Sequence, residues 1–445
     1  RDESEWMVRM VENRGTESMN DMVSACGKFL ANLPESKCTA RELATALARF
    51  GIGAMDVERA AALLPEHYDL SYAGVRMLIS EYLGEFCRIF CESGRKTCEV
   101  SVPSPQFVIM YLQSAAGDSA AFRTGALFMQ VVLRSFFLFD RPFAPELNRM
   151  RMCGLNRARH WLVYSEGAPE LVLQFGVLCD ECVKCCEGED CRTHIVNAVF
   201  PKGTARCDDA YADAAVEMLL SAAETELDLK PSRKDWMRAL GTYLRLTKVE
   251  NELAALNARR GRRPLDGNSF ALAQTAELAV FSGWDGVLAA LETLAGELEA
   301  APSDDGLARA YCYYTPFLHP WVDALCRSRG VRLMGSAVFL NDAKPKSLTP
   351  GAMTAAWLNG MNVRKDALAE AGQIAHAIQN SGCSAYVTGL FSFDRWLGPP
   401  AALHAEELSR LGIPTFTLRG DFWSEQPGPG ETEVESMCEA ITGRA

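Results

Sequence analysis

Five cysteines within thirteen residues are the feature of this sequence most capable of chemistry. The run from Cys179 to Cys191 reads CDECVKCCEGEDC. Adjacent cysteines do not readily bond to each other, and a segment so rich in thiols and charges makes a poor structural core. Cysteines at this close spacing in a loop are typical ligands of zinc or of an iron–sulfur cluster. The candidate ligands for such a thiophilic metal in this run are Cys179, Cys182, Cys185, Cys186 and Cys191.

An apolar run directly precedes these cysteines. Leu171 to Leu178 is continuously apolar except for Gln174 and Gly176, which is typical of a strand buried in a parallel sheet. In open α/β sheets, ligands bind where strands end. We therefore expect the site at the carboxyl end of this strand, and this position is a stronger indication than the cysteine spacing alone.

The strands and helices expected around the site indicate an α/β protein. From residue 304 onward, strand and helix patterns alternate across short turns, which predicts a parallel sheet with helices on both faces. We expect two Rossmann-like lobes with parallel sheets, at residues 96–207, including the cysteine run, and 304–445. A helical connection is expected at 208–303 and a helical N-terminal region at 1–95.

The second lobe supplies candidate substrate-binding residues. Thr315 and His319 follow one expected strand, and Gly389 and Asp394 lie at the end of another. Residues at strand ends are the best candidates to line a pocket. His319 is the best placed of the six histidines for acid–base work, although the sequence favours a structural role for it. The sequence assigns no catalytic residue.

Composition narrows the class of protein. A formal net charge of −12 argues against nucleic acid or an anionic membrane as the main partner. The sequence shows no secretory leader and no apolar run of transmembrane length, so its 16 cysteines are expected to be reduced, in a cytoplasmic and anaerobic setting. The glycine-rich motifs of nucleotide binding and the motifs of serine hydrolases and zinc proteases are missing.

Several segments, in order along the chain, resemble one known family. They are MCGLNRAR from Met152, GVLCDEC from Gly176, VENELAALNARRGRRPLDG from Val249, NSGCSAYVTGLFSFDRW from Asn380 and LGIPTFTLRGDF from Leu411. Together they resemble the iron–sulfur subunits of the 2-hydroxyacyl-CoA dehydratase and benzoyl-CoA reductase family. Each segment alone is weakly specific, whereas their order and spacing are more so.

The resemblance implies a fold, a cofactor and partners. Members of this family hold a [4Fe–4S] cluster between Rossmann-like lobes, work as heterodimers with a homologous second subunit, and receive low-potential electrons from an ATP-hydrolysing activator protein. Their substrates are acyl-CoA thioesters. By resemblance, this chain is an iron–sulfur subunit of an acyl-CoA dehydratase or reductase, passing single electrons to a thioester. Cys153 and Cys179 match the first two cysteines of the family pattern.

The third family cysteine is replaced by Phe393. Phenylalanine cannot ligate iron, and Cys383 lies at the opposite end of the same expected strand. Cysteines of the run after Cys179 could serve as local replacements or form an additional cluster. Two alternatives stay open: a non-catalytic partner subunit of the same fold that has lost the standard cluster, or a protein stabilised by zinc in the cysteine run.

Overall fold

The structure is a computed structural model of the chain. The residues it describes are 18–91, 94–101, 103–124, 131, 134–138, 169–176, 194–199, 206–303, 306–314, 320–334, 344–361, 366–390, 398–419 and 428–443. No helix in these ranges is both long and apolar enough to cross a membrane.

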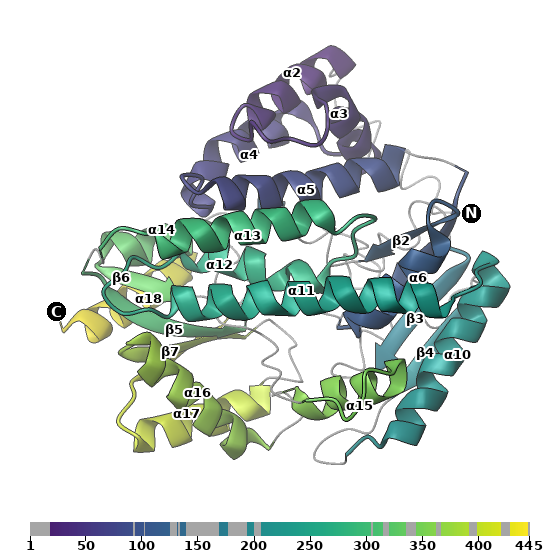
Figure 1. Cartoon of the computed structure of the whole chain (residues 1–445). Helices are drawn as coiled ribbons and strands as arrows, with labels where there is room; N and C mark the ends of the chain where they lie inside the picture. The colour runs from purple at the N-terminus through teal and green to yellow at the C-terminus, as the bar shows by residue number, and fades with distance from the viewer. Residues whose placement is uncertain are drawn as a thin grey trace.

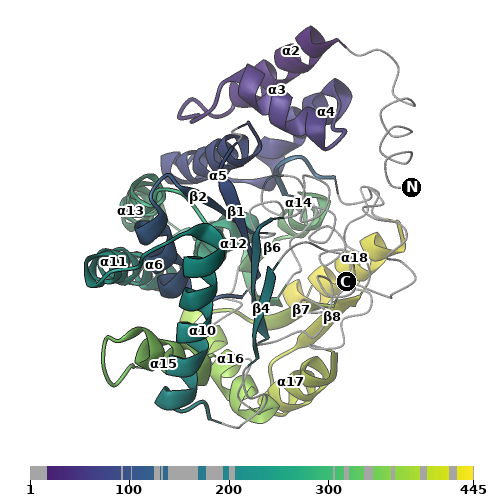
Figure 2. The ribbon, with the colours of Figure 1, turned by 90° about the vertical axis from the view of Figure 1, so that its right-hand side faces the viewer.

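A helical domain forms the N-terminal part of the described chain. It contains α2 (Met19–Leu30), α3 (Ala40–Arg49), α4 (Ala54–His67) and α5 (Ala73–Cys91). The first two helices begin at capping boxes, in which Ser18 or Thr39 pairs with the acidic residue three positions later. Figure 2 shows α2, α3 and α4 above α5, at one end of the molecule.

The first lobe contains a parallel sheet of β1 (Lys96–Val100), β2 (Ala120–Thr124), β3 (Leu171–Gly176) and β4 (His194–Val199), in the order β2-β1-β3-β4. One face of this sheet is apolar. Its side chains form a core with α6 (Gln106–Ala116) and α10 (Asp209–Leu227). All six residues of β3 are buried, as its apolar pattern predicts.

The second lobe contains a parallel sheet of β5 (Ala308–Tyr314), β6 (Val331–Met334), β7 (Ala385–Leu390) and β8 (Thr415–Arg419), in the order β6-β5-β7-β8. Two helices, α16 (Ala367–Ser381) and α17 (Gly398–Arg410), pack on one face. Residues of α14 (Pro320–Ser328) and α18 (Gly428–Thr442) share a core with the other.

The two sheets have the same strand order. In each, the second strand lies on one side of the first, and the third and fourth strands lie on the other. The sequence shows no corresponding internal repeat. Each lobe is a four-stranded parallel sheet packed with helices, and in the second lobe the helices lie on both faces, as in doubly wound folds. The predicted fold class of two Rossmann-like lobes with a helical connection and a helical N-terminal region is confirmed.

A helical connection joins the lobes. Its helices are α11 (Arg233–Asn257), α12 (Gly267–Gln274) and α13 (Asp285–Glu299). α11 runs across the front of Figure 1 from the first lobe to the second. At its start, Trp236 packs edge-to-face on Phe107 of α6. Beyond its end, the carbonyls of Arg259 and Arg262 accept hydrogen bonds from the buried guanidinium of Arg309 in β5.

A second connection between the lobes is α15 (Pro350–Gly360), which follows β6 in sequence but packs on α10 of the first lobe. A side chain at Gly351 would place Cβ 1.6 Å from Asp213 Oδ1, so only glycine allows this approach. The Asn359 amide also brackets the backbone of Cys207, accepting from its N–H at 2.9 Å and donating to its carbonyl at 2.8 Å. These contacts fix the two lobes to each other.

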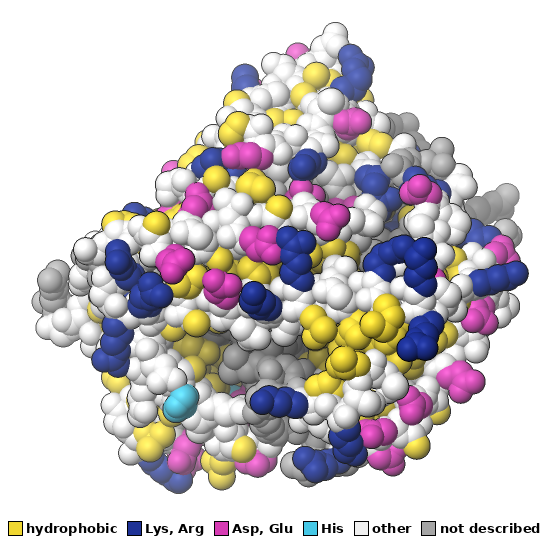
Figure 3. Space-filling model, in the orientation of Figure 1, with side chains coloured by type: hydrophobic (Ala, Val, Ile, Leu, Met, Phe, Trp, Pro, Cys, Tyr) yellow, Lys and Arg dark blue, Asp and Glu magenta, His cyan; other side chains and the backbone are white. Residues whose placement is uncertain are grey.

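The carboxyl ends of both sheets are directed toward the region between the lobes. In Figure 1, β5 and β7 run from the left toward the middle, and β3 and β4 run downward from the upper right. Figure 3 shows that this face of the molecule is hollowed below α11, between the lobes. Except after β1, where only residue 102 lies outside them, the described ranges end at or near the carboxyl end of every strand. Most of the loops that follow the strands therefore lie outside the described ranges.

Candidate functional site at the carboxyl ends of the sheets

The strand order identifies one switch point in each sheet. The chain leaves the first strand toward one side and returns to the third strand on the other, which leaves a crevice between the carboxyl ends of these two strands. The switch points are therefore at β1 and β3 in the first lobe and at β5 and β7 in the second. Ligands of open α/β sheets bind at such positions.

The predicted site residues follow the switch-point strands. β3 ends at Gly176, three residues before Cys179. β5 ends at Tyr314, directly before Thr315, and His319 follows four residues later. The strands that precede these segments, β3 and β5, therefore lie at the switch points, where a ligand is expected. The sequence pattern alone does not give this strand order.

Gly389 is the one predicted site residue within the described ranges. It is the penultimate residue of β7, is buried, and pairs with Tyr314 of β5. The predicted residues outside the described ranges are Thr315, His319, Asp394 and the cysteines Cys153, Cys179, Cys182, Cys185, Cys186 and Cys191. Within the described ranges, no group of three His, Cys, Asp or Glu side chains could hold a metal ion.

The second face of the first sheet is polar at positions where buried parallel strands are usually apolar. Glu99 of β1 and Arg123 of β2 are paired in the register and are both buried. Arg123 Nε lies 3.4 Å from Glu99 Oε2. Farther toward the carboxyl end, Gln174 of β3 pairs with Asn197 of β4. Side chains two residues apart share a face, so polar groups extend along this face toward the switch point.

Gln174 is the most unusual member of this face. Its side chain is fully buried, yet neither its Oε1 nor its Nε2 has a hydrogen-bond partner among the described residues. Buried polar groups are nearly always paired, and each exception requires an explanation. Gln174 lies in the strand that leads to Cys179, so the group that pairs with its amide is expected outside the described residues, near this end of the sheet.

Ser101 ties the two switch-point strands of the first lobe together just beyond β1. Its N–H donates to the carbonyl of Leu173 at 2.9 Å, and its hydroxyl accepts from the N–H of Phe175 at 2.8 Å. These bonds continue the ladder between β1 and β3 by one residue. The backbone on both sides of Gln174 is therefore held rigidly.

A buried network of polar side chains lies near the switch point of the second lobe. The hydroxyl of Tyr313 in β5 donates to the Glu370 carboxylate on α16. Glu370 Oε2 also lies 3.0 Å from Nε2 of His404 on α17. All three side chains are buried. Burial, reinforced by the Glu370 charge, raises the pKa of Tyr313.

The raised pKa of Tyr313 keeps its hydroxyl proton close to the end of β5. Histidine and glutamate are the side chains that most often carry protons in catalysis, and Tyr313 is the residue before Tyr314, where β5 ends. The sequence pattern indicates a surface or helix position for His404. It is on a helix but buried, because Ala401, His404 and Leu408 share the inward face of α17. That helical spacing is the signal that could have identified it.

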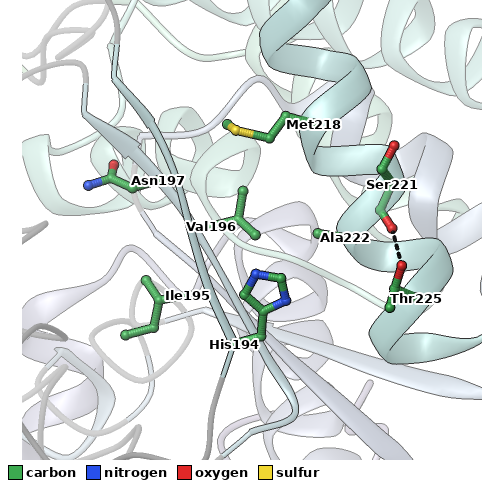
Figure 4. A pocket seen from close by; sticks show the side chains of 8 residues that line it. All are labelled: His194, Ile195, Val196, Asn197, Met218, Ser221, Ala222 and Thr225. Carbon is green, nitrogen blue, oxygen red and sulfur yellow. Dashed lines mark hydrogen bonds between the residues drawn. The ribbon is translucent and has the colours of Figure 1, made fainter.

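An open groove of about 380 Å³ lies between β4 and α10 (Figure 4). His194, Asn197, Met218 and Thr225 are among the side chains that line it. His194 begins β4, and its Nδ1 lies 2.9 Å from Glu226 Oε1 near the end of α10. The groove thus extends along the sheet edge from the amino end of β4, away from where the topology rule places ligands.

No model of a protein family and no curated protein matches this chain. A function must therefore be inferred from where the strands end and from the side chains that they carry. Two observations are the most specific. One is the order of the strands that precede the predicted site residues, and the other is the buried amide of Gln174 in one of those strands, which has no partner within the described ranges.

Proposed function

We propose that this chain is an iron–sulfur subunit of a low-potential acyl-CoA dehydratase or reductase. It would work in the cytoplasm with a homologous second subunit and an ATP-hydrolysing activator protein, on an acyl-CoA thioester. One observation carries this proposal: the two sheets have the same strand order, and Cys179 and Phe393 each follow the third strand of their sheet by three residues. Both positions follow a switch-point strand.

The residues proposed to hold the cluster are chemically suited to it. Thiolates are the ordinary ligands of a [4Fe–4S] cluster, and Cys153 and Cys179 would be joined by cysteines of the run that ends at Cys191. The cluster supplies single electrons at low potential. Gln174, in the strand before Cys179, offers a buried donor and acceptor without a partner among the described residues, which is compatible with a bound group near this strand end.

The chain's own side chains would bind the substrate and control its protons. The loop after β5, with Thr315 and His319, and the end of β7, with Gly389 and Asp394, are the proposed substrate-binding segments. The Tyr313–Glu370–His404 network would keep a proton near the end of β5 and would hold this strand end in place.

The second candidate is a non-catalytic partner subunit. It is favoured by Phe393, which stands where the strand order places a counterpart of Cys179. Cys383 does not offer a replacement from the same strand. It precedes the amino end of β7, and the six residues of this strand span about 20 Å.

Metal analysis of the anaerobically purified chain tests the proposal. We expect about four irons per chain and broad absorption at about 400 nm, with an EPR signal after reduction. Cys179→Ser should lose the iron, whereas Cys383→Ser should keep it. Zinc without a chromophore would replace the proposal with a zinc-stabilised protein, and colourless, metal-free protein would refute both metal sites.

A gain of ligand distinguishes the subunit types. If Phe393 occupies a vacated ligand position, Phe393→Cys should increase iron retention and slow bleaching of the chromophore in air. Phe391→Cys is the matched control, because it adds a thiol two residues earlier. Equal behaviour of the two variants would contradict the assignment of Phe393. Co-purification with a homologous chain that has all three family cysteines would support the partner-subunit alternative.

A further inference from the structure

Two thiols of the helical domain are in direct contact. Cys38 lies in the turn between α2 and α3, and Cys87 lies on α5. Their side chains share a hydrogen bond. Both are free thiols, and Cys38 is partly exposed whereas Cys87 is buried. A disulfide requires two cysteines from elements that pack closely together, as the turn before α3 and α5 do.

Backbone packing holds this contact in place. A side chain at Gly84 of α5 would put its Cβ 2.7 Å from the Cβ of Lys37, so the turn before α3 lies directly on α5. Cys87 is three residues beyond Gly84 and therefore lies on the same side of the helix. One further turn along, the Cys91 thiol donates to the Glu42 carbonyl at 3.4 Å. The turn and the helix are thus joined on both sides of the thiol pair.

The two thiols differ in reactivity. The hydrogen bond from Cys87 lowers the pKa of Cys38, and the Ser36 hydroxyl, 3.8 Å from its sulfur, acts in the same direction. The same contact, together with burial, raises the pKa of Cys87. The thiolate is the nucleophilic form of cysteine. Cys38 is therefore the more reactive thiol and also the more accessible one.

We propose that Cys38 and Cys87 form a redox-responsive dithiol that a peroxide converts to a disulfide. The Cys38 thiolate attacks one peroxide oxygen, forms a sulfenic acid and releases hydroxide. The Cys87 thiol then attacks the sulfenic sulfur, forms the S–S bond and releases water. The two thiols lose two electrons and two protons, and hydrogen peroxide is reduced to two waters. This proposal does not depend on the proposed function.

A second thiol pair provides an internal comparison. Cys326 on α14 and Cys438 on α18 also share a hydrogen bond, but both are completely buried. The two pairs have the same contact and differ in access. Since oxidation requires the thiolate to reach the oxidant, the Cys38–Cys87 pair should be oxidised first.

Peptide mapping after mild oxidation tests the proposal. The full chain is reduced, treated anaerobically with hydrogen peroxide at increasing molar ratios, alkylated, and digested without reductant for mass spectrometry. We expect the cross-linked peptide of Cys38 and Cys87 at lower peroxide than that of Cys326 and Cys438. Recovery of Cys38 and Cys87 as alkylated thiols after the buried pair has reacted would overturn the proposal.

Variants separate the two steps. Cys87→Ser should leave Cys38 as a sulfenic acid that dimedone traps, and Cys38→Ser should prevent the adduct. Cys26→Ser is the matched control, because Cys26 is a buried thiol on α2 of the same domain, and it should leave the cross-link unchanged. A dimedone adduct that is missing from folded Cys87→Ser chain would contradict the role of Cys38. The mapping of the unaltered chain decides the question even if a variant does not fold.

Discussion

Replacing Gln174 by methionine tests whether the unpaired amide marks a ligand site. Gln174 is fully buried in β3, and both polar atoms of its side chain lack partners among the described residues. An unpaired buried polar group costs about 1–3 kcal/mol. Methionine has nearly the same length and shape but no amide. Gln174→Met should therefore increase the free energy of unfolding by about 2 kcal/mol.

The matched control is a buried amide that is paired. Asn257, at the end of α11, is 2% exposed, and its Oδ1 accepts from the N–H of Leu265 at 2.8 Å. Asn257→Leu leaves that buried N–H without its partner, so it should decrease the free energy of unfolding by about 1–3 kcal/mol. Urea denaturation of the anaerobically purified proteins, followed by circular dichroism, measures both changes through the shift of the midpoint at constant slope.

The opposite signs of the two changes are the test. If Gln174→Met destabilises the protein as much as Asn257→Leu, the amide of Gln174 is paired in solution and its use as a marker of the site is wrong. If Gln174→Met stabilises the protein and also lowers its iron content or alters its EPR spectrum, the amide is retained for the bound group. A stabilised variant with an unchanged spectrum would separate Gln174 from the metal site.

Two further predictions concern the contacts that hold the domains and lobes. Gly74→Ala should destabilise the protein by about 1–3 kcal/mol, because its Cβ would lie 2.5 Å from the Cβ of Leu294 on α13. The control is Gly27→Ala, whose Cβ would meet nothing within 4 Å and which should be neutral or stabilising in the same urea titration. Equal effects of the two substitutions would contradict the close approach of α5 to α13. Burial, reinforced by Asp266, raises the pKa of Asp323 to about 7, above an unfolded value of about 4. The folded state therefore holds the proton of Asp323 more tightly than the unfolded state does. The stabilisation that this proton gives is complete below the unfolded pKa and is lost as the pH rises through the folded pKa. Between pH 5 and 8 the free energy of unfolding should fall by about 2–3 kcal/mol. Melting temperatures of Asp323→Asn should fall less over this range than those of the unaltered chain, and parallel profiles would refute the assignment.

Burial on both faces is what made β3 predictable. Its run from Leu171 is apolar enough to stand out from sequence alone, and the structure has a strand there. β2 and β4 do not stand out in the sequence pattern. Both strands are short and contain polar side chains. Arg123 of β2 is buried beside Glu99 of β1, its partner in an ion pair, and such a partner is not visible in a local pattern.

The same limitation applies to the candidate site. The strand ends before Cys179 and Thr315 could be predicted because they follow apolar runs. The order of the strands could not, because it depends on which strands pair across the chain. The helical spacing of α17 indicates that His404 is buried, but it does not indicate the contact of His404 with Glu370. The other partner of Glu370, Tyr313, is 57 positions away in sequence. Topology and long-range polar contacts are therefore what the structure adds.

The two lobes share a strand order but carry different chemistry at their switch points. In the first lobe, a thiol follows the third strand, and the buried amide of Gln174 has no partner in the part of the chain that the structure describes. In the second, a phenylalanine follows the third strand and the buried polar side chains of Tyr313, Glu370 and His404 contact one another. Thiolates are ligands of iron and zinc, whereas a phenylalanine side chain cannot bind either metal. We therefore expect the metal to be bound mainly by the first lobe, with the second lobe contributing the substrate pocket and its proton.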